Sequence, residues 1–165
     1  MYITTSGFRP TSIWSVGRAI EAAFANEPDA AFDVDELCRL VYGVRWSHIE
    51  KKHRVAVLRT AKARPGLKYL RSERSGGMLI FYTPDNVMSY GMARLKGDRL
   101  EDPYQTNTDL RKRLRPGGDH HKLIVPGGVW HLHTEIFKAE RDGDTKKLKE
   151  LQREQDRALA AIFGR

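Results

Sequence analysis

The amino-acid sequence predicts a mainly α-helical fold with a small β hairpin, an α+β architecture. Two helix starts with similar capping signals follow one another in the first third of the chain. Two short runs of β-favouring residues come directly after them, and helical periodicity returns near residue 129. With 165 residues, of which 40% are hydrophobic, the chain can form one compact domain or a small domain with an appendage.

A first helix is expected after Ser12. Apolar residues from Ile13 to Phe24 recur at the spacing of one buried helix face. Pro28 ends this pattern, because proline cannot continue a helix. Residues 31–32 are then expected to form a very short strand.

The second predicted helix has a clearer start. Asp33 and, three residues later, Glu36 have the spacing of a capping box, in which each side chain accepts a hydrogen bond from the backbone N–H of the other residue. Gly43 is a natural helix end. The apolar stripe of this helix consists of Val34, Leu37, Cys38 and Val41.

The third helix is predicted over residues 47–64. Ser47 and Glu50 repeat the capping-box spacing, and Pro65 stops the helical pattern. Only residues 43–46 separate this helix from the one before it. A turn of that length with a glycine at its start is typical of a helix-turn-helix connection.

A β hairpin and a short helix are expected next. Residues 68–72 alternate polar and apolar side chains, and residues 78–83 are rich in β-branched and aromatic side chains. The intervening residues 73–77 contain two glycines and are typical of a hairpin loop. Residues 87–95 then carry the apolar pattern of a short helix.

The last part of the chain is predicted to be a linker followed by two helices. Glycine and proline interrupt residues 97–128, where we expect no regular element. Helical patterns return in residues 129–141 and 145–163. The predicted organisation is a first domain with a trailing short helix at 1–96, a linker at 97–128, and a helical hairpin at 129–165.

Basic residues are concentrated in one segment. The chain has a formal net charge of +8 and an isoelectric point near 9.7. Between Arg39 and Arg74 there are eleven basic and two acidic residues, a net charge of +9, so the rest of the chain is close to neutral. A basic segment in an otherwise neutral chain indicates a binding face for a polyanion.

The third predicted helix divides into two faces at about 100° per residue. Arg54 falls on the apolar side and fits the pattern badly, so it is expected to pair with Asp35 or Glu36, unless the helix phase is shifted by one residue. The apolar side, which would pack on the preceding helices, contains Ile49, Val57, Leu58 and Ala61. The opposite arc contains His48, Lys51, Lys52, Val55, Arg59 and Lys62.

The order of these elements resembles a winged helix-turn-helix domain over residues 12–83, and residues 50–64 resemble helix-turn-helix proteins of bacteria and their phages. The resemblance implies a protein that binds double-stranded DNA, with a sequence-specific transcriptional regulator as the expected function. The third helix would enter the major groove, and the hairpin at residues 68–83 would act as the wing.

The chemistry of the basic face suggests individual roles. Lys or Arg near the helix N-terminus can donate to guanine, and Val55 can contact a thymine methyl group. Phosphate contacts are expected from Lys62, Arg64 and Lys68, and wing contacts from Arg71 and Arg74. The predicted DNA-binding residues are Arg45, Ser47, His48, Lys51, Lys52, Val55, Arg59, Lys62, Arg64, Lys68, Arg71 and Arg74.

Three other interpretations are open at this point. The basic run can be a solvated helix face, although such faces usually mix both signs of charge. The protein can be a non-catalytic adaptor that binds another protein through its C-terminal helices. A metal-dependent enzyme would depend on Asp119 together with His120, His121, His131 and His133. Because no further metal-binding motif accompanies them, we expect no catalysis, no metal and no cofactor.

The remaining features concern assembly and location. The single cysteine, Cys38, allows no intrachain disulfide, and no run of about 20 apolar residues predicts a membrane span. The N-terminal residues lack a signal-peptide pattern, so a cytoplasmic, nucleoid-associated protein is expected. A heptad-like spacing in the last helix fits either a homodimer or packing on the preceding helix, and its members are Leu148, Leu151, Gln155, Ala158 and Ile162.

Overall fold

The structure is a computed structural model that describes residues 13–43, 50–72, 77–98 and 105–164. It is mainly helical, with a small three-stranded antiparallel sheet, which confirms the predicted α+β class. The chain divides into two compact units, Met1–Gly97 and Asp98–Arg165.

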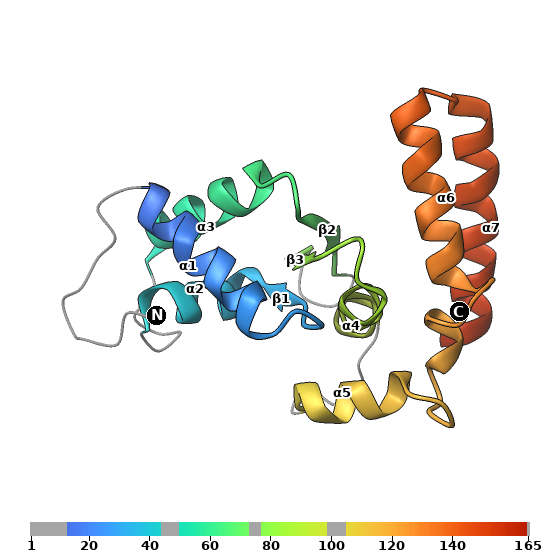
Figure 1. The fold of residues 1–165 in the computed structure, drawn as a ribbon, viewed down its shortest axis with the longest axis horizontal. Helices are drawn as coiled ribbons and strands as arrows, with labels where there is room; N and C mark the ends of the chain where they lie inside the picture. Colours follow the sequence, from blue (N-terminus) through green and yellow to red (C-terminus); the bar gives the residue numbers. More distant parts are fainter. Residues whose placement is uncertain (1–12, 44–49, 73–76, 99–104, 165) are drawn as a thin grey trace. The chain divides into compact units, whose positions relative to one another are not determined.

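Three helices begin the first unit (Figure 1), namely α1 (Ile13–Asn26), α2 (Val34–Tyr42) and α3 (Lys51–Ala63). Each of them packs against the other two. The predicted capping box of α2 is present: the Asp33 carboxylate accepts from the Glu36 N–H at 2.7 Å, and the Glu36 carboxylate accepts from the Asp33 N–H at 3.0 Å. Gly43 ends α2 at a φ of 64°, a left-handed conformation that favours glycine.

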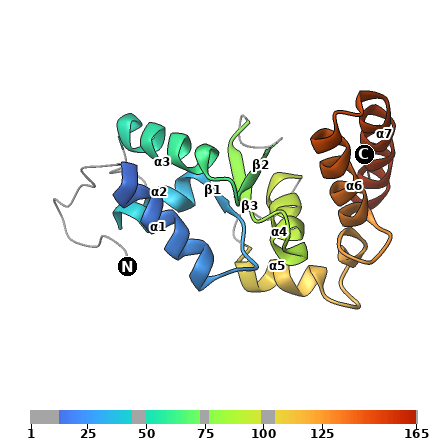
Figure 2. The ribbon, with the colours of Figure 1, turned by 45° about the horizontal axis from the view of Figure 1, so that its top comes forward.

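The sheet has the strand order β1-β3-β2, with both neighbouring pairs antiparallel. Its strands are β1 (Phe32–Asp33), β2 (Lys68–Arg71) and β3 (Leu79–Tyr82). Phe32 of β1 and Tyr69 of β2 both lie opposite Phe81 of the central strand. Helix α4 (Val87–Gly97) follows β3 and packs on β2 and β3 (Figure 2).

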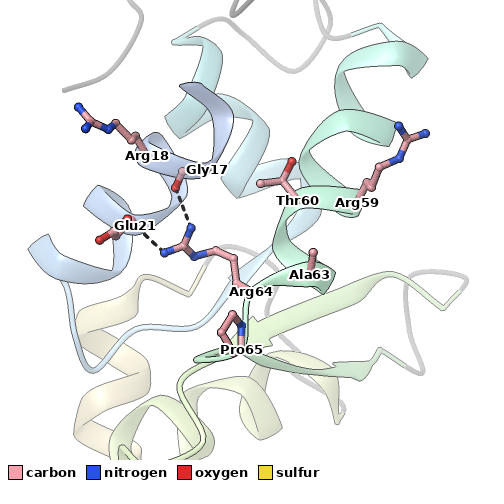
Figure 3. Close-up of a pocket in the computed structure, with 8 residues that line it drawn as sticks. All are labelled: Gly17, Arg18, Glu21, Arg59, Thr60, Ala63, Arg64 and Pro65. Carbon is pink, nitrogen blue, oxygen red and sulfur yellow. Dashed lines mark hydrogen bonds and ion pairs between the residues drawn. The ribbon is translucent and has the colours of Figure 1, made fainter. Parts of the chain in front are cut away.

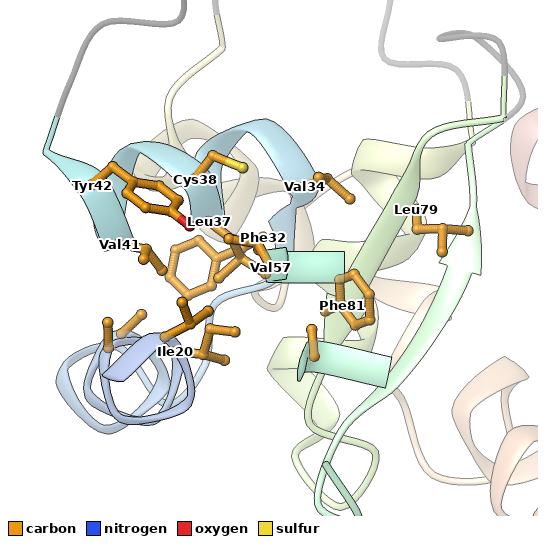
Figure 4. Packing of buried hydrophobic residues seen from close by; sticks show 14 of the residues in the cluster. Ile20, Phe32, Val34, Leu37, Cys38, Val41, Tyr42, Val57, Leu79 and Phe81 are labelled. Carbon is orange, nitrogen blue, oxygen red and sulfur yellow. The ribbon is translucent and has the colours of Figure 1, made fainter. Parts of the chain in front are cut away.

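One hydrophobic core joins the three helices to the sheet (Figure 4). Ile20 of α1, Leu37 of α2 and Val57 of α3 are completely buried in it, as is Phe81 of β3. Burial of side chains of this size stabilises a fold by about 1.5–3 kcal/mol each. Helix α3 is therefore held in the unit through one of its faces.

The start of α3 differs from the prediction. The helix begins at Lys51, and Glu50 has extended backbone angles, φ −82° and ψ 160°, as its N-cap residue. The Glu50 N–H donates to Nδ1 of His53 at 3.2 Å, so a histidine takes the place that Glu or Gln usually has in a capping box. The predicted start at Ser47 is wrong, because an extended Glu50 interrupts a continuous helix; Ser47 itself lies outside the described residues.

The second unit contains regular structure where a linker was predicted. Its elements are α5 (Asn107–Leu114), the 3-10 turn η2 (His121–Leu123), α6 (Val129–Asp142) and α7 (Thr145–Phe163). Helix α5 begins with a capping box in which Thr106 accepts from the Asp109 N–H at 3.2 Å, and Leu110 and Leu114 are buried. The expectation of no regular element in residues 97–128 is therefore wrong for α5 and η2. Burial of Leu110 and Leu114 stabilises α5, a helix that the composition of this segment did not indicate.

Helices α6 and α7 pack against each other as a hairpin. Gly143 ends α6 at a φ of 72°, and the Asp144 side chain caps α7 by accepting from the Lys147 N–H at 3.1 Å. Gln155 and Leu159 of α7 are buried within the chain. Of the five residues of the heptad-like seam, Gln155 is buried and the other four are half-buried, and a homodimer through these helices stays a prediction.

Candidate nucleic-acid interface

Helix α3 presents two chemically different faces. His53, Val57, Thr60 and Ala61 are buried. On the opposite side Lys51, Lys52, Val55, Arg59 and Lys62 are all exposed, as the helical wheel predicts. Four of these five exposed side chains are cations, and none is an acid. The helix is thus anchored by one face and carries concentrated positive charge on the other.

Most of this charge is not neutralised by acidic neighbours. Within the described part of the chain, Lys51 and Arg59 have no acidic partner. Lys52 lies 3.3 Å from Glu50, but both side chains are more than half exposed, at 70% and 56%. Such exposed pairs contribute about 0–1 kcal/mol and are screened by salt. The face can therefore exchange these contacts for a polyanion at little cost.

The centre of this face is a shallow hollow of about 440 Å³, with an apolar side chain in the middle of the cations. Val55 is 42% exposed, although it is a large hydrophobic residue. Its neighbours in the hollow are Lys51, Lys52, Ala56 and Arg59. The hollow combines a hydrophobic contact surface with hydrogen-bond donors. Base edges in the major groove of DNA present matching groups, namely methyl groups and hydrogen-bond acceptors.

Arg54, which the helical wheel placed badly, pairs with α2. Its Nε lies 3.6 Å from Oδ1 of Asp35, one of the two partners expected from the sequence. The side chain is 42% exposed and the Asp35 carboxylate 16%. Arg54 therefore links α3 to α2 at the border between the buried and exposed faces.

Arg64 does not join the exposed cationic face. Figure 3 shows its guanidinium turned toward α1, where Nη2 lies 3.1 Å from Oε2 of Glu21 and Nη1 donates to the Gly17 carbonyl at 3.4 Å. These contacts border an open hollow of about 630 Å³ that Arg18 and Arg59 also line. In this structure the Arg64 guanidinium contacts an acid and a carbonyl of α1, and its phosphate contact stays a prediction.

The hairpin continues the cationic face beyond the end of α3. The Lys62 ammonium lies 5.6 Å from the ring centroid of Tyr69 on β2, which is 45% exposed. Arg71, two residues further along the same strand face, is exposed and donates to the Gly77 carbonyl at 2.9 Å. Lys68 is half-buried and on the other face of the strand. Tyr69 and Arg71 thus extend the surface of α3, whereas Lys68 does not.

Tyr69 is a surface residue that the sequence analysis did not select. The alternation in residues 68–72 contained the signal, since side chains two apart on a strand share a face. Of the predicted interface residues, Arg45, Ser47, His48 and Arg74 lie outside the described residues. The exposed surface formed by α3 and β2 is called the α3–β2 face, and its residues are Lys51, Lys52, Val55, Arg59, Lys62, Tyr69 and Arg71.

The histidines of the second unit are separately engaged. Nδ1 of His121 lies 2.6 Å from the Leu114 carbonyl oxygen, and Nδ1 of His120 lies 3.0 Å from the Asp119 carboxylate. His133 is buried beside the Phe137 ring, whereas His131 is exposed. Across the described residues, no group of three or more His, Cys, Asp or Glu side chains is placed to hold a metal ion. The Asp-His-His and His-x-His patterns therefore do not converge on one site.

Cys38 is completely buried in the core of the first unit. Burial, together with the nearby Asp35 carboxylate, raises the pKa of its thiol to about 12. A thiol with this pKa is protonated at neutral pH and is a poor nucleophile. The residue is a small hydrophobic core side chain, as its position on the apolar stripe of α2 predicts.

Comparison with known proteins found no matching family model, no matching curated protein and no matching solved structure. None of the helices within the described ranges is long and apolar enough to cross a membrane.

Proposed function

We propose that this protein binds double-stranded DNA through the α3–β2 face, as a sequence-specific transcriptional regulator. The observation that carries the proposal is the division of α3: one face is buried in the core, and the other exposes four cations, one of which, Lys52, pairs with the exposed Glu50. A recognition helix needs this division, because one face holds it to the scaffold and the other contacts phosphates and base edges.

The arrangement of the first unit also supports a winged-helix mode of binding. Helices α1, α2 and α3 pack together, and β2 and β3 follow α3 as an antiparallel pair. The strand order β1-β3-β2 places the short first strand on the far side of β3 from β2. In this mode α3 would lie in the major groove and the end of the β2–β3 pair would contact the adjacent backbone.

Individual roles follow from position along α3. Lys51 and Lys52 are at the N-terminal end, where a recognition helix usually meets base edges, and lysine can donate to guanine O6 and N7. Val55, which lines the central hollow, would contact a thymine methyl group. Arg59 and Lys62, nearer the C-terminal end, would contact phosphates, as would Arg71 on β2.

The test is a binding measurement with duplex DNA, single-stranded DNA and duplex RNA over a series of salt concentrations. We expect the tightest binding to duplex DNA, because an α-helix fits the B-form major groove and not the narrow A-form groove. A plot of the logarithm of the binding constant against the logarithm of the salt concentration should fall with a slope of about 0.9 for each phosphate contact.

A pair of double variants separates the α3–β2 face from net charge. Lys51→Ala with Arg59→Ala should weaken duplex binding at least about tenfold and make the salt dependence shallower, by a slope of roughly 2. The control is Lys149→Ala with Arg153→Ala on α7, which removes the same charge from exposed positions of the other unit. Equal losses in both variants, or no duplex binding by the unaltered protein at low salt, would contradict the proposal.

A further inference from the structure

Tyr69 and Lys62 form a paired site at the junction of α3 and β2. Tyr69 is 45% exposed, and the described residues contain one other exposed large hydrophobic side chain, Val55, on the same α3–β2 face. The Lys62 ammonium lies 5.6 Å from the centroid of the Tyr69 ring. A cation at this distance is attracted by the ring, which restricts a lysine side chain that would otherwise be mobile.

The strand pairing fixes the position of the ring. Tyr69 is directly opposite Phe81 in the β2–β3 ladder, and the two ring centroids are 5.5 Å apart. Phe81 is completely buried in the core. The Tyr69 ring is therefore supported by the core on one side and contacts Lys62 on another, so its orientation does not depend on a ligand.

The hydroxyl of Tyr69 is the unused group of this pair. Within the described residues it makes no hydrogen bond, and the Lys62 ammonium has no acidic partner. The phenol O–H and an ammonium held 5.6 Å from the centroid of the same ring are both donors, and together they fit one acceptor of high negative charge. A backbone phosphate of DNA has this chemistry, and Tyr, Lys and Arg commonly donate to it.

We propose that Tyr69 and Lys62 together bind one phosphate of the DNA backbone, with the ring of Tyr69 acting as a positioning group for the Lys62 ammonium. This inference rests on the proposed duplex binding by α3. It differs from base stacking, in which the ring itself would receive a base and the hydroxyl would be dispensable. The contact reads no base, so it sets the register of α3 on the duplex.

Two single variants test the pair on two duplexes of unrelated sequence over a salt series. Tyr69→Phe keeps the ring and removes one hydrogen bond to a charged acceptor, so we expect binding to both duplexes to weaken by roughly tenfold or more. Its salt slope should equal that of the unaltered protein, because a neutral hydroxyl displaces no counterion. Lys62→Ala should weaken binding and reduce the slope by about 0.9, while Lys149→Ala on α7 should do neither.

The double variant Tyr69→Phe with Lys62→Ala distinguishes one shared phosphate from two separate contacts. A shared phosphate predicts a loss smaller than the product of the two single losses. Thermal unfolding of each variant verifies that the fold is retained. Full binding by Tyr69→Phe, or losses that simply multiply, would overturn the inference.

The experiments distinguish a failure of the phosphate site from a failure of the proposed function. If Lys51→Ala with Arg59→Ala weakens duplex binding while Tyr69→Phe does not, α3 binds DNA and the phosphate site is wrong. If the unaltered protein does not bind duplex DNA, both proposals are wrong.

Discussion

Helices α3 and α7 each carry five basic residues, yet they use them differently. Over its 13 residues α3 has no acidic residue, whereas the 19 residues of α7 include Glu150, Glu154 and Asp156. On α7, Lys146 and Glu150 are four residues apart, and Glu154 and Arg157 are three apart, spacings at which opposite charges attract on a helix. The five basic residues of α7 are interspersed with three acids, whereas the five of α3 have no acid within the helix and repel one another.

The comparison also sets the two units apart. Residues 1–97 contain 15 basic and nine acidic residues, a net charge of +6, and residues 98–165 contain 14 and 12, a net charge of +2. The two units thus contain nearly equal numbers of basic side chains, but the first contains fewer acids, and α3 contains none. The proposed DNA contact of α3 therefore rests on the placement of its basic residues rather than on their number.

The largest expected effects are on stability. They test whether burial of one hydrophobic side chain stabilises α3 and α7 to a similar extent. Val57 of α3 is completely buried and Leu159 of α7 is 7% exposed. Val57→Ala should lower the free energy of unfolding by about 2 kcal/mol and Leu159→Ala by about 2–3 kcal/mol, through lost burial and the cavity left behind. Denaturant unfolding of each variant measures both values.

Duplex binding by the same two variants, measured where each is folded, sharpens the comparison. Neither substitution touches the α3–β2 face, so affinity and salt slope should equal those of the unaltered protein. A changed salt slope in folded Leu159→Ala would show that α7 contributes cations to the interface, and the contrast between the helices would then be wrong.

Local signals predicted those parts of the fold that depend on a few adjacent residues. The capping box of Asp33 and Glu36 and the glycine at 43 were enough to place α2. The start of α3 was misplaced because Glu50 can belong to two overlapping boxes, and His53 is not a residue that the usual pattern includes. The box at Thr106 that starts α5 was present in the sequence but was obscured by the surrounding Gly and Pro residues.

The candidate site was predictable where helical periodicity alone decides exposure. Lys51, Val55 and Arg59 fall on one face of any α-helix with this register. The tie between Arg64 and Glu21 joins residues 43 positions apart, so no local pattern contains it. The pairing of Lys62 with Tyr69 likewise depends on how the chain turns from α3 into β2.

A smaller, pH-dependent effect compares the Asp caps of α2 and α7. Burial is the main cause that raises the pKa of Asp33 to about 6, from an ordinary value of 3.8. Because the folded state then holds its proton more tightly than the unfolded state, this group stabilises the fold below about pH 4, and that contribution is lost as the pH rises through 6. Asp144, the cap of α7, is exposed.

Asp33→Asn keeps an oxygen acceptor for the Glu36 N–H and removes the titration. Between pH 4 and pH 7 the free energy of unfolding of Asp33→Asn should therefore rise by about 1–2 kcal/mol relative to the unaltered protein. Asp144→Asn serves as the control for the same substitution at an exposed helix cap. Parallel pH profiles for the unaltered protein and Asp33→Asn would contradict the raised pKa of Asp33.

The smallest expected effect is the absence of a reaction at Cys38. The thiol is completely buried and its pKa is raised to about 12, so at pH 8 a thiol reagent such as an aromatic disulfide should not label the folded protein. Labelling should become complete in denaturant.

Because Cys38 lies in the core that α2 and α3 share, its labelling rate reports the opening of that core. The rate should rise in Val57→Ala and stay unchanged in Lys51→Ala with Arg59→Ala, since only the first of these alters the buried face of α3. Rapid labelling of the unaltered protein would show that the core opens readily, and α3 would then lack the rigid support that a recognition helix requires.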